Sequence, residues 1–94
     1  HIEGDGVDGE PILVRMQHLD SNLHVNNAQY VSMAVDSLPQ DFQIGGLRVE
    51  YKKQAHLNDT LYPHVIEQTD GRKVVSLRGE EADVYVNVEF TSIK

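Results

Sequence analysis

The sequence predicts an α+β domain in which one long helix packs on a curved antiparallel sheet of about five strands. Three observations support this fold class. Apolar residues recur at helical spacing in one segment, apolar and polar residues alternate along the segments that follow, and short turn sequences separate those segments. Strands joined by short turns pair antiparallel, and a helix with a single apolar stripe covers one face of a sheet. A generic two-layer α+β sandwich fits the same periodic pattern.

The predicted helix begins at Asn27 and ends before Pro39. Its apolar residues fall three, four, seven, eight and eleven positions after Asn27, and they are Tyr30, Val31, Ala34, Val35 and Leu38. This spacing forms one stripe, so all five are expected in the core. Asn26 or Asn27 can cap the helix by accepting a hydrogen bond from a backbone N–H, and Pro39 stops it.

One short strand is predicted before the helix and four after it, within segments 11–16, 44–52, 61–67, 74–78 and 84–91. Asn58-Asp59, the Asp70-Gly71 dipeptide and the polar segment 79–83 supply the turns between the later strands. Residues 1–10 hold three glycines and four acidic residues, and we expect a linker or cloning remnant there and no folded element. The predicted domain is therefore 11–94.

Composition narrows the function classes. Ninety-four residues suit one domain, and 39% hydrophobic and 24% charged residues are typical of a folded chain. A net charge of −7 does not favour nucleic acid or an anionic membrane surface as a partner. The absence of cysteine excludes disulfides and a cysteine nucleophile, and no apolar run reaches the roughly 20 residues of a membrane span. We expect a cytoplasmic protein. Lys52-Lys53 is read as a solvated strand face, with a docking patch for an acidic carrier as the alternative.

The segment before the helix is unusually rich in chemistry-bearing side chains. Asp20, Asn22 and His24 alternate, so in an extended stretch they would converge on one spot. Asp20 or His24 could take a proton from water as general base, while Asn22 or the first N–H groups of the helix stabilise an oxyanion. Turn and cap formation is the competing interpretation of the same residues. A metal site from His18, Asp20 and His24 is a third, although the spacing matches no zinc signature.

The run from Leu19 to Tyr30 resembles the acyl-acyl-carrier-protein thioesterases of bacteria and plants, whose pattern Asp-x-Asn-x-His-Val-Asn-Asn-x-x-Tyr it matches at every fixed position. Segment 47–53 resembles the strand that follows in that family. The resemblance implies a hotdog domain, the second of a tandem pair, in which Asp20, Asn22 and His24 are catalytic. It also implies substrate-binding positions at Asn26, Asn27 and Tyr30.

One position departs from that family. The family often places a Glu after the Tyr-basic-basic run, with a neighbouring Cys in plants, and here Gln54 and Ala55 stand there. Gln54 cannot act as a general base, but it could orient a water in the catalytic site. The resemblance therefore implies hydrolysis of a fatty acyl thioester by water that Asp20 activates, without a covalent cysteine intermediate.

The resemblance also sets expectations about partners. We expect an acyl thioester substrate on acyl carrier protein, and either a second hotdog domain in cis or a homodimer. No cofactor, metal, nucleic acid or membrane is expected. Two alternatives stay open, which are an acyl-coenzyme A thioesterase and a non-catalytic hotdog module for acyl binding or assembly.

Overall fold

The structure, a computed structural model, describes residues 6–21 and 24–93. One helix, one short 3₁₀ turn and six strands make up this part of the chain. In chain order they are β1 (Gly6–Asp8), β2 (Ile12–Leu13), η1 (Met16–His18), α1 (Asn27–Asp36), β3 (Ile44–Tyr51), β4 (Thr60–Glu67), β5 (Lys73–Arg78) and β6 (Val84–Ser92).

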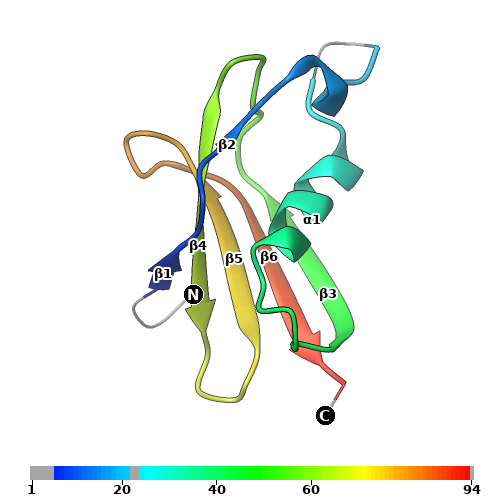
Figure 1. Cartoon of the computed structure of the whole chain (residues 1–94), viewed down its shortest axis with the longest axis vertical. Coiled ribbons are helices and arrows are strands. Elements are labelled where there is room, and N and C mark those ends of the chain that lie inside the picture. Colours follow the sequence, from blue (N-terminus) through cyan, green and yellow to red (C-terminus); the bar gives the residue numbers. More distant parts are fainter. Residues whose placement is uncertain (1–5, 22–23, 94) are drawn as a thin grey trace.

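The strands form one antiparallel sheet in the order β1-β4-β5-β6-β3, with β2 also paired to β4. Helix α1 crosses one face of this sheet, as Figure 1 shows. The predicted fold class is confirmed, but the sheet has six strands and not about five. The order leaves β1 at one edge of the sheet and β3 at the other.

Strand β1 is the element that the sequence did not predict. Segment 6–8 was expected to be linker, yet it pairs with β4 in the register Gly6↔Ile66, Val7↔Val65 and Asp8↔His64. The linker expectation is wrong for these residues, whereas residues 1–5 lie outside the described part. Three residues are too few to show an alternating pattern, and the pairing depends on backbone hydrogen bonds along β4. A contact of 2.6 Å between Asp8 Oδ1 and His64 Nδ1 adds to it.

Pro63 accounts for the break between β1 and β2. It lies inside β4, opposite Leu77 of β5, and its carbonyl accepts from the Gly9 N–H at 2.9 Å. In a strand the N–H and C=O of one residue face the same neighbour, so the missing N–H of Pro63 also faces the N-terminal segment. The ladder to β5 is therefore intact, while the N-terminal side is divided between β1 and β2.

The helix buries a narrower arc than its apolar spacing predicts. Tyr30, Met33 and Ala34 are buried, whereas Val35 is 38% exposed. Val35 lies five positions beyond Tyr30, roughly 140° around the helix, so it points away from the sheet. The prediction that Val35 is core is wrong, and Met33 takes its place.

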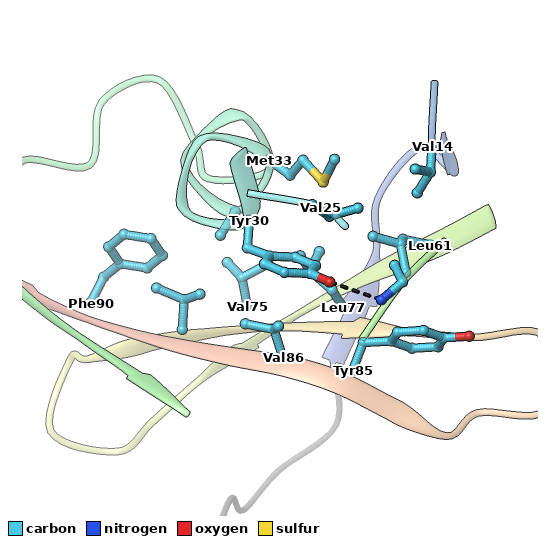
Figure 2. Close-up of a cluster of buried hydrophobic side chains, with 13 residues drawn as sticks. Val14, Val25, Tyr30, Met33, Leu61, Val75, Leu77, Tyr85, Val86 and Phe90 are labelled. Atoms are coloured by element: carbon cyan, nitrogen blue, oxygen red, sulfur yellow. Dashed lines mark hydrogen bonds between the residues drawn. The ribbon is translucent and has the colours of Figure 1, made fainter. Parts of the chain in front are cut away.

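The core lies between α1 and the sheet (Figure 2). It contains side chains from the helix, from the segments on either side of it, and from β4, β5 and β6. The largest fully buried side chain is that of Phe90. No helix in the described ranges is long and apolar enough to cross a membrane.

Candidate functional site

The polar segment before the helix is a closed turn and not an extended stretch. Leu19 pairs with Val25, and the Asp20 N–H donates to the His24 carbonyl at 2.9 Å. The Asp20 carboxylate also accepts from the His24 N–H, with Oδ1 at 3.2 Å. The turn, and not the predicted alternation, therefore brings residues 20 and 24 together. Asn22 lies outside the described residues.

The turn is attached to the start of the helix. The Asn26 N–H donates to the His18 carbonyl at 3.1 Å, and His18 Nδ1 accepts from the Arg15 N–H at 2.9 Å. His18 is thereby occupied in closing η1, so its ring serves the local backbone. Within the described residues, no three His, Cys, Asp or Glu side chains are grouped to hold a metal ion.

The helix N-terminus is capped as the sequence predicts, and the capping residue is Asn26. Its Oδ1 accepts from the Ala28 N–H at 2.8 Å, and its carbonyl accepts from the Gln29 N–H at 2.9 Å. The Asn26 side chain is therefore committed to the cap, which does not favour its predicted role in substrate binding. The next residue, Asn27, has an exposed side chain beside this cap.

Three of the predicted site residues line one cavity of about 390 Å³. They are Asn27, Tyr30 and Gln54, and the other described residues of its lining are Val25, Tyr51, Lys52 and Lys53. Asp20 and His24 do not line this cavity. They lie in the turn that Val25 closes, so the turn borders the cavity through that buried residue.

Tyr30 connects the helix to the loop that carries Gln54. Its hydroxyl accepts from the Ala55 N–H at 2.9 Å, and both residues are buried (Figure 2). Its ring also meets the ring of Tyr51 with centroids 6.0 Å apart. Burial raises the pKa of the Tyr30 phenol, although the hydrogen bond from Ala55 opposes that shift. The position predicted to bind substrate thus fixes the backbone next to Gln54.

Two lysines of the cavity are held by backbone and side-chain contacts. The N–H groups of Lys52 and Lys53 both donate to the Tyr85 carbonyl, at 2.8 and 3.0 Å. Lys53 Nζ lies 2.7 Å from Asp83 Oδ2, and this hydrogen bond lowers the pKa of the Asp83 carboxyl and raises that of the Lys53 amine. Lys52 Nζ lies 3.5 Å from Glu50 Oε2. Acidic neighbours therefore offset part of the positive charge at the cavity rim.

His56 is a neighbour of the site that the sequence did not indicate. Its ring meets the ring of His24 edge to face, with centroids 6.3 Å apart and planes at 86°. Both side chains project from loops that the fold brings together. No sequence signal could have shown this contact, because it depends on the placement of the β3–β4 loop beside the turn.

The sequence matches the model of one protein family. Residues 7–91 match the acyl-ACP thioesterase C-terminal domain. No curated protein matches the sequence.

Solved structures share the fold at low sequence identity. An acyl-ACP thioesterase from Bacteroides thetaiotaomicron is 17% identical, with a TM-score of 0.82 over 96% of this chain and 38% of that one. The 12:0-ACP thioesterase from Umbellularia californica is 18% identical, with a TM-score of 0.76 over 92% of this chain and 34% of that one. A hypothetical protein from Staphylococcus aureus in complex with CoA is 16% identical, with a TM-score of 0.80 over 95% of this chain and 75% of that one. The chain thus has the hotdog fold expected from its motif, and it spans little more than a third of the first two structures.

Proposed function

This chain belongs to the family of acyl-ACP thioesterase C-terminal domains, and on that premise we propose that the protein containing it hydrolyses fatty acyl thioesters carried by acyl carrier protein. The observation that carries the proposal is the turn at Asp20–His24. It holds the Asp20 carboxylate against the backbone N–H of His24 just before the helix, and Val25, which closes this turn, lines a cavity together with Gln54 and Asn27.

In the proposed mechanism Asp20 is the general base. Its carboxylate takes a proton from a water molecule while that water attacks the thioester carbonyl carbon. The tetrahedral intermediate then collapses and the C–S bond breaks. The protonated Asp20 returns its proton to the leaving thiolate sulfur, so a free thiol and a free fatty acid form and the carboxylate is regenerated. His24 orients the carboxylate and the water, and Asn22 is proposed to do the same. No protein–substrate covalent bond is needed, in keeping with a chain that lacks cysteine.

The helix start supplies donors for the developing oxyanion. Capping engages the Ala28 N–H, and the N–H groups of Gln29 and Tyr30 donate to the Asn26 carbonyl. This leaves the Asn27 N–H, with the Asn27 side chain, as the first-turn donors next to the cavity. Asn27 is therefore the residue of the helix start that we propose contacts substrate.

Gln54 lies where the resemblance leads one to expect a glutamate. An amide cannot accept a proton from water, but it can hold one by accepting and donating hydrogen bonds. The Tyr30 hydroxyl fixes the neighbouring Ala55 N–H, so the backbone that presents Gln54 is restrained. We propose that Gln54 orients the attacking water and that Asp20 removes its proton.

We further propose that the chain works as one hotdog domain of a pair, either with a second hotdog domain in cis or with a second copy of itself. Strand β3 is an open edge of the sheet, because no strand in the described part of the chain pairs with its outer side. On it Leu47 and Tyr51 are each about half-exposed, and their cross-strand partners Phe90 and Val86 are core residues, so these side chains lie on the helix side. A partner sheet at this edge would cover them.

The test compares Asp20→Asn with wild type in the natural protein. Asparagine retains an oxygen that can accept from the His24 N–H, so the turn is preserved while the base is lost. We expect kcat for acyl-acyl-carrier-protein hydrolysis to fall by about 10²- to 10⁴-fold. Release of free thiol measures the rate, and the same assay with acyl-coenzyme A identifies the preferred carrier. Asp36→Asn, at the far end of the helix, is the matched control and should retain full activity.

A second arm separates the roles of Asp20 and Gln54. If Asp20 is the base, Gln54→Glu should change kcat by no more than a few-fold. A large gain in Gln54→Glu, together with an active Asp20→Asn variant, would assign the base to position 54 and disprove the mechanism. A wild-type protein that binds acyl thioesters without hydrolysing them would favour the non-catalytic acyl-binding module.

A further inference from the structure

The edge-to-face contact between two histidines extends the site beyond its motif. We propose that His56 is a positioning residue that holds the imidazole of His24 in its working orientation. The inference rests on the function proposed above. Its direct support is the contact itself, with ring centroids 6.3 Å apart and planes at 86°. Aromatic rings prefer such an arrangement at centroid separations of 4.5–7 Å, because the positive edge of one ring meets the negative face of the other.

The backbone N–H and carbonyl of His56 are both hydrogen-bonded to Asp59. The His56 N–H donates to Asp59 Oδ2 at 2.8 Å, and the Asp59 N–H donates to the His56 carbonyl at 3.0 Å. Val14 then clamps this turn to the segment after β2, because it accepts from the Asn58 N–H at 3.0 Å and donates to the Asp59 carbonyl at 2.8 Å. His56 is thus presented from a fixed loop.

The His24 ring needs such a neighbour. Its backbone is fixed by hydrogen bonds to Asp20, but His24 itself is exposed. An exposed histidine can exchange between rotamers unless a neighbouring group favours one of them. The ring of His56 is a group placed to do this. It does not touch the cavity of Asn27 and Gln54, so its effect would pass through His24.

The charged groups around the pair are consistent with this role. Asp59 Oδ2 lies 3.8 Å from His56 Nδ1, which favours one orientation of the His56 ring as well as of its backbone. The Asp20 carboxylate accepts a hydrogen bond from the backbone N–H of His24. Asp59 therefore holds His56, and the His56 ring contacts the His24 ring. The backbone of His24 is in turn hydrogen-bonded to Asp20, the proposed base.

A double-mutant cycle in the natural protein tests the proposal. We expect His56→Ala to lower kcat for acyl thioester hydrolysis by about 3- to 10-fold with KM within about twofold, the size of effect that one aromatic contact can give. His56→Phe keeps a ring at this position and should restore most of kcat. In the His24→Ala background, His56→Ala should have no further effect. His64→Ala, which removes another histidine next to an aspartate, is the control and should leave kcat unchanged.

Each other outcome overturns the proposal. Additive losses in the cycle would show that His56 acts independently of His24. Failure of His56→Phe to recover activity, with an unfolding temperature equal to that of wild type, would show that the ring contact is not the cause. If His24→Ala hydrolyses acyl thioesters as fast as wild type, then His24 has no role that His56 could support. That result would overturn this inference and leave the thioesterase function intact. A wild-type protein without hydrolysis would instead refute the function proposed above, and this inference with it.

Discussion

At the scale of single residues, Tyr30 shows how one side chain serves both stability and the site. Its phenol is buried, and its oxygen accepts the Ala55 N–H that would otherwise be an unpaired donor in the core. Loss of that acceptor in Tyr30→Phe should lower the free energy of unfolding by about 1–3 kcal/mol. It should also loosen the backbone at Gln54.

The same residue predicts a dependence of stability on alkaline pH. Burial raises the pKa of Tyr30 above its ordinary value of 10.0. Below that value both states hold the proton, so pH has no effect through this group. As pH rises past it, the unfolded chain releases the proton first, so the stability contributed by the neutral phenol is progressively lost until the pH passes the raised folded pKa.

Denaturant unfolding at several pH values between about 9 and 11 measures this effect. The difference in unfolding free energy between wild type and Tyr30→Phe should shrink as pH rises, because phenylalanine cannot ionise. Tyr51→Phe, which alters the ring that Tyr30 touches, is the comparison variant. A difference that stays constant across the range would contradict the assignment.

The sequence could predict the composition of the site better than its geometry. The residues of the turn and the cap were evident from their types and spacing, because Asp, Asn and His are rare in such density. The reversal of the chain at Asp20–His24 was not, since alternation is equally compatible with an extended stretch. His56 lies 32 positions from His24, and only the folded sheet brings the two rings together.

At the scale of elements, the start of α1 is the feature most open to test. Asn26 satisfies the Ala28 N–H through its side chain. Asn26→Ala should therefore destabilise the protein by about 1 kcal/mol, which lowers the melting temperature by about 4–8 °C in a domain of this size. Thermal unfolding monitored by circular dichroism measures the shift. Asn27→Ala removes a neighbouring amide that does not cap the helix, and an equal shift there would refute the assignment of the cap.

The long elements were predictable because each contains several repeats of the apolar spacing typical of its type of secondary structure. Helix α1 and strands β3 to β6 lie where the predicted segments do, within a few residues at each end. Strand β1 has no such pattern, because its three residues pair through the backbone with an edge that β4 presents. Short edge strands of this kind are determined by tertiary context.

At the scale of the whole molecule, the open β3 edge predicts how the isolated chain assembles. Without a second hotdog domain in cis, the chain of 10.6 kDa should form a dimer through that edge. Leu47→Lys places a charge among the half-exposed apolar side chains and should convert the dimer to a monomer. Light scattering on the eluting protein gives the mass. Leu13→Lys changes a similarly exposed leucine on β2 and should leave the dimer intact, so a monomeric wild type, or a dimer insensitive to Leu47→Lys, would contradict the proposal.

The order of the strands in the sheet could not be predicted from the sequence, because local periodicity does not show which strands are neighbours. It places the first strand of the chain and the third at opposite rims. Antiparallel pairing was predictable from the short turns. Which strand forms the open edge of the sheet could be seen only in the structure.

Because of Pro63, the two edges of the sheet differ in how well they can pair with another chain. A proline that faces outward from β4 allows only short, divided pairing there, and β1 ends after three residues. A β-rich chain that can pair at both edges of its sheet can add copies indefinitely and form fibres, whereas a chain that can pair at only one edge binds a single further copy. The N–H that Pro63 lacks would thus limit assembly to two subunits. Two copies related by twofold symmetry would use both β3 edges, and a third subunit would have only the short, divided edge of β1 and β2 to pair with.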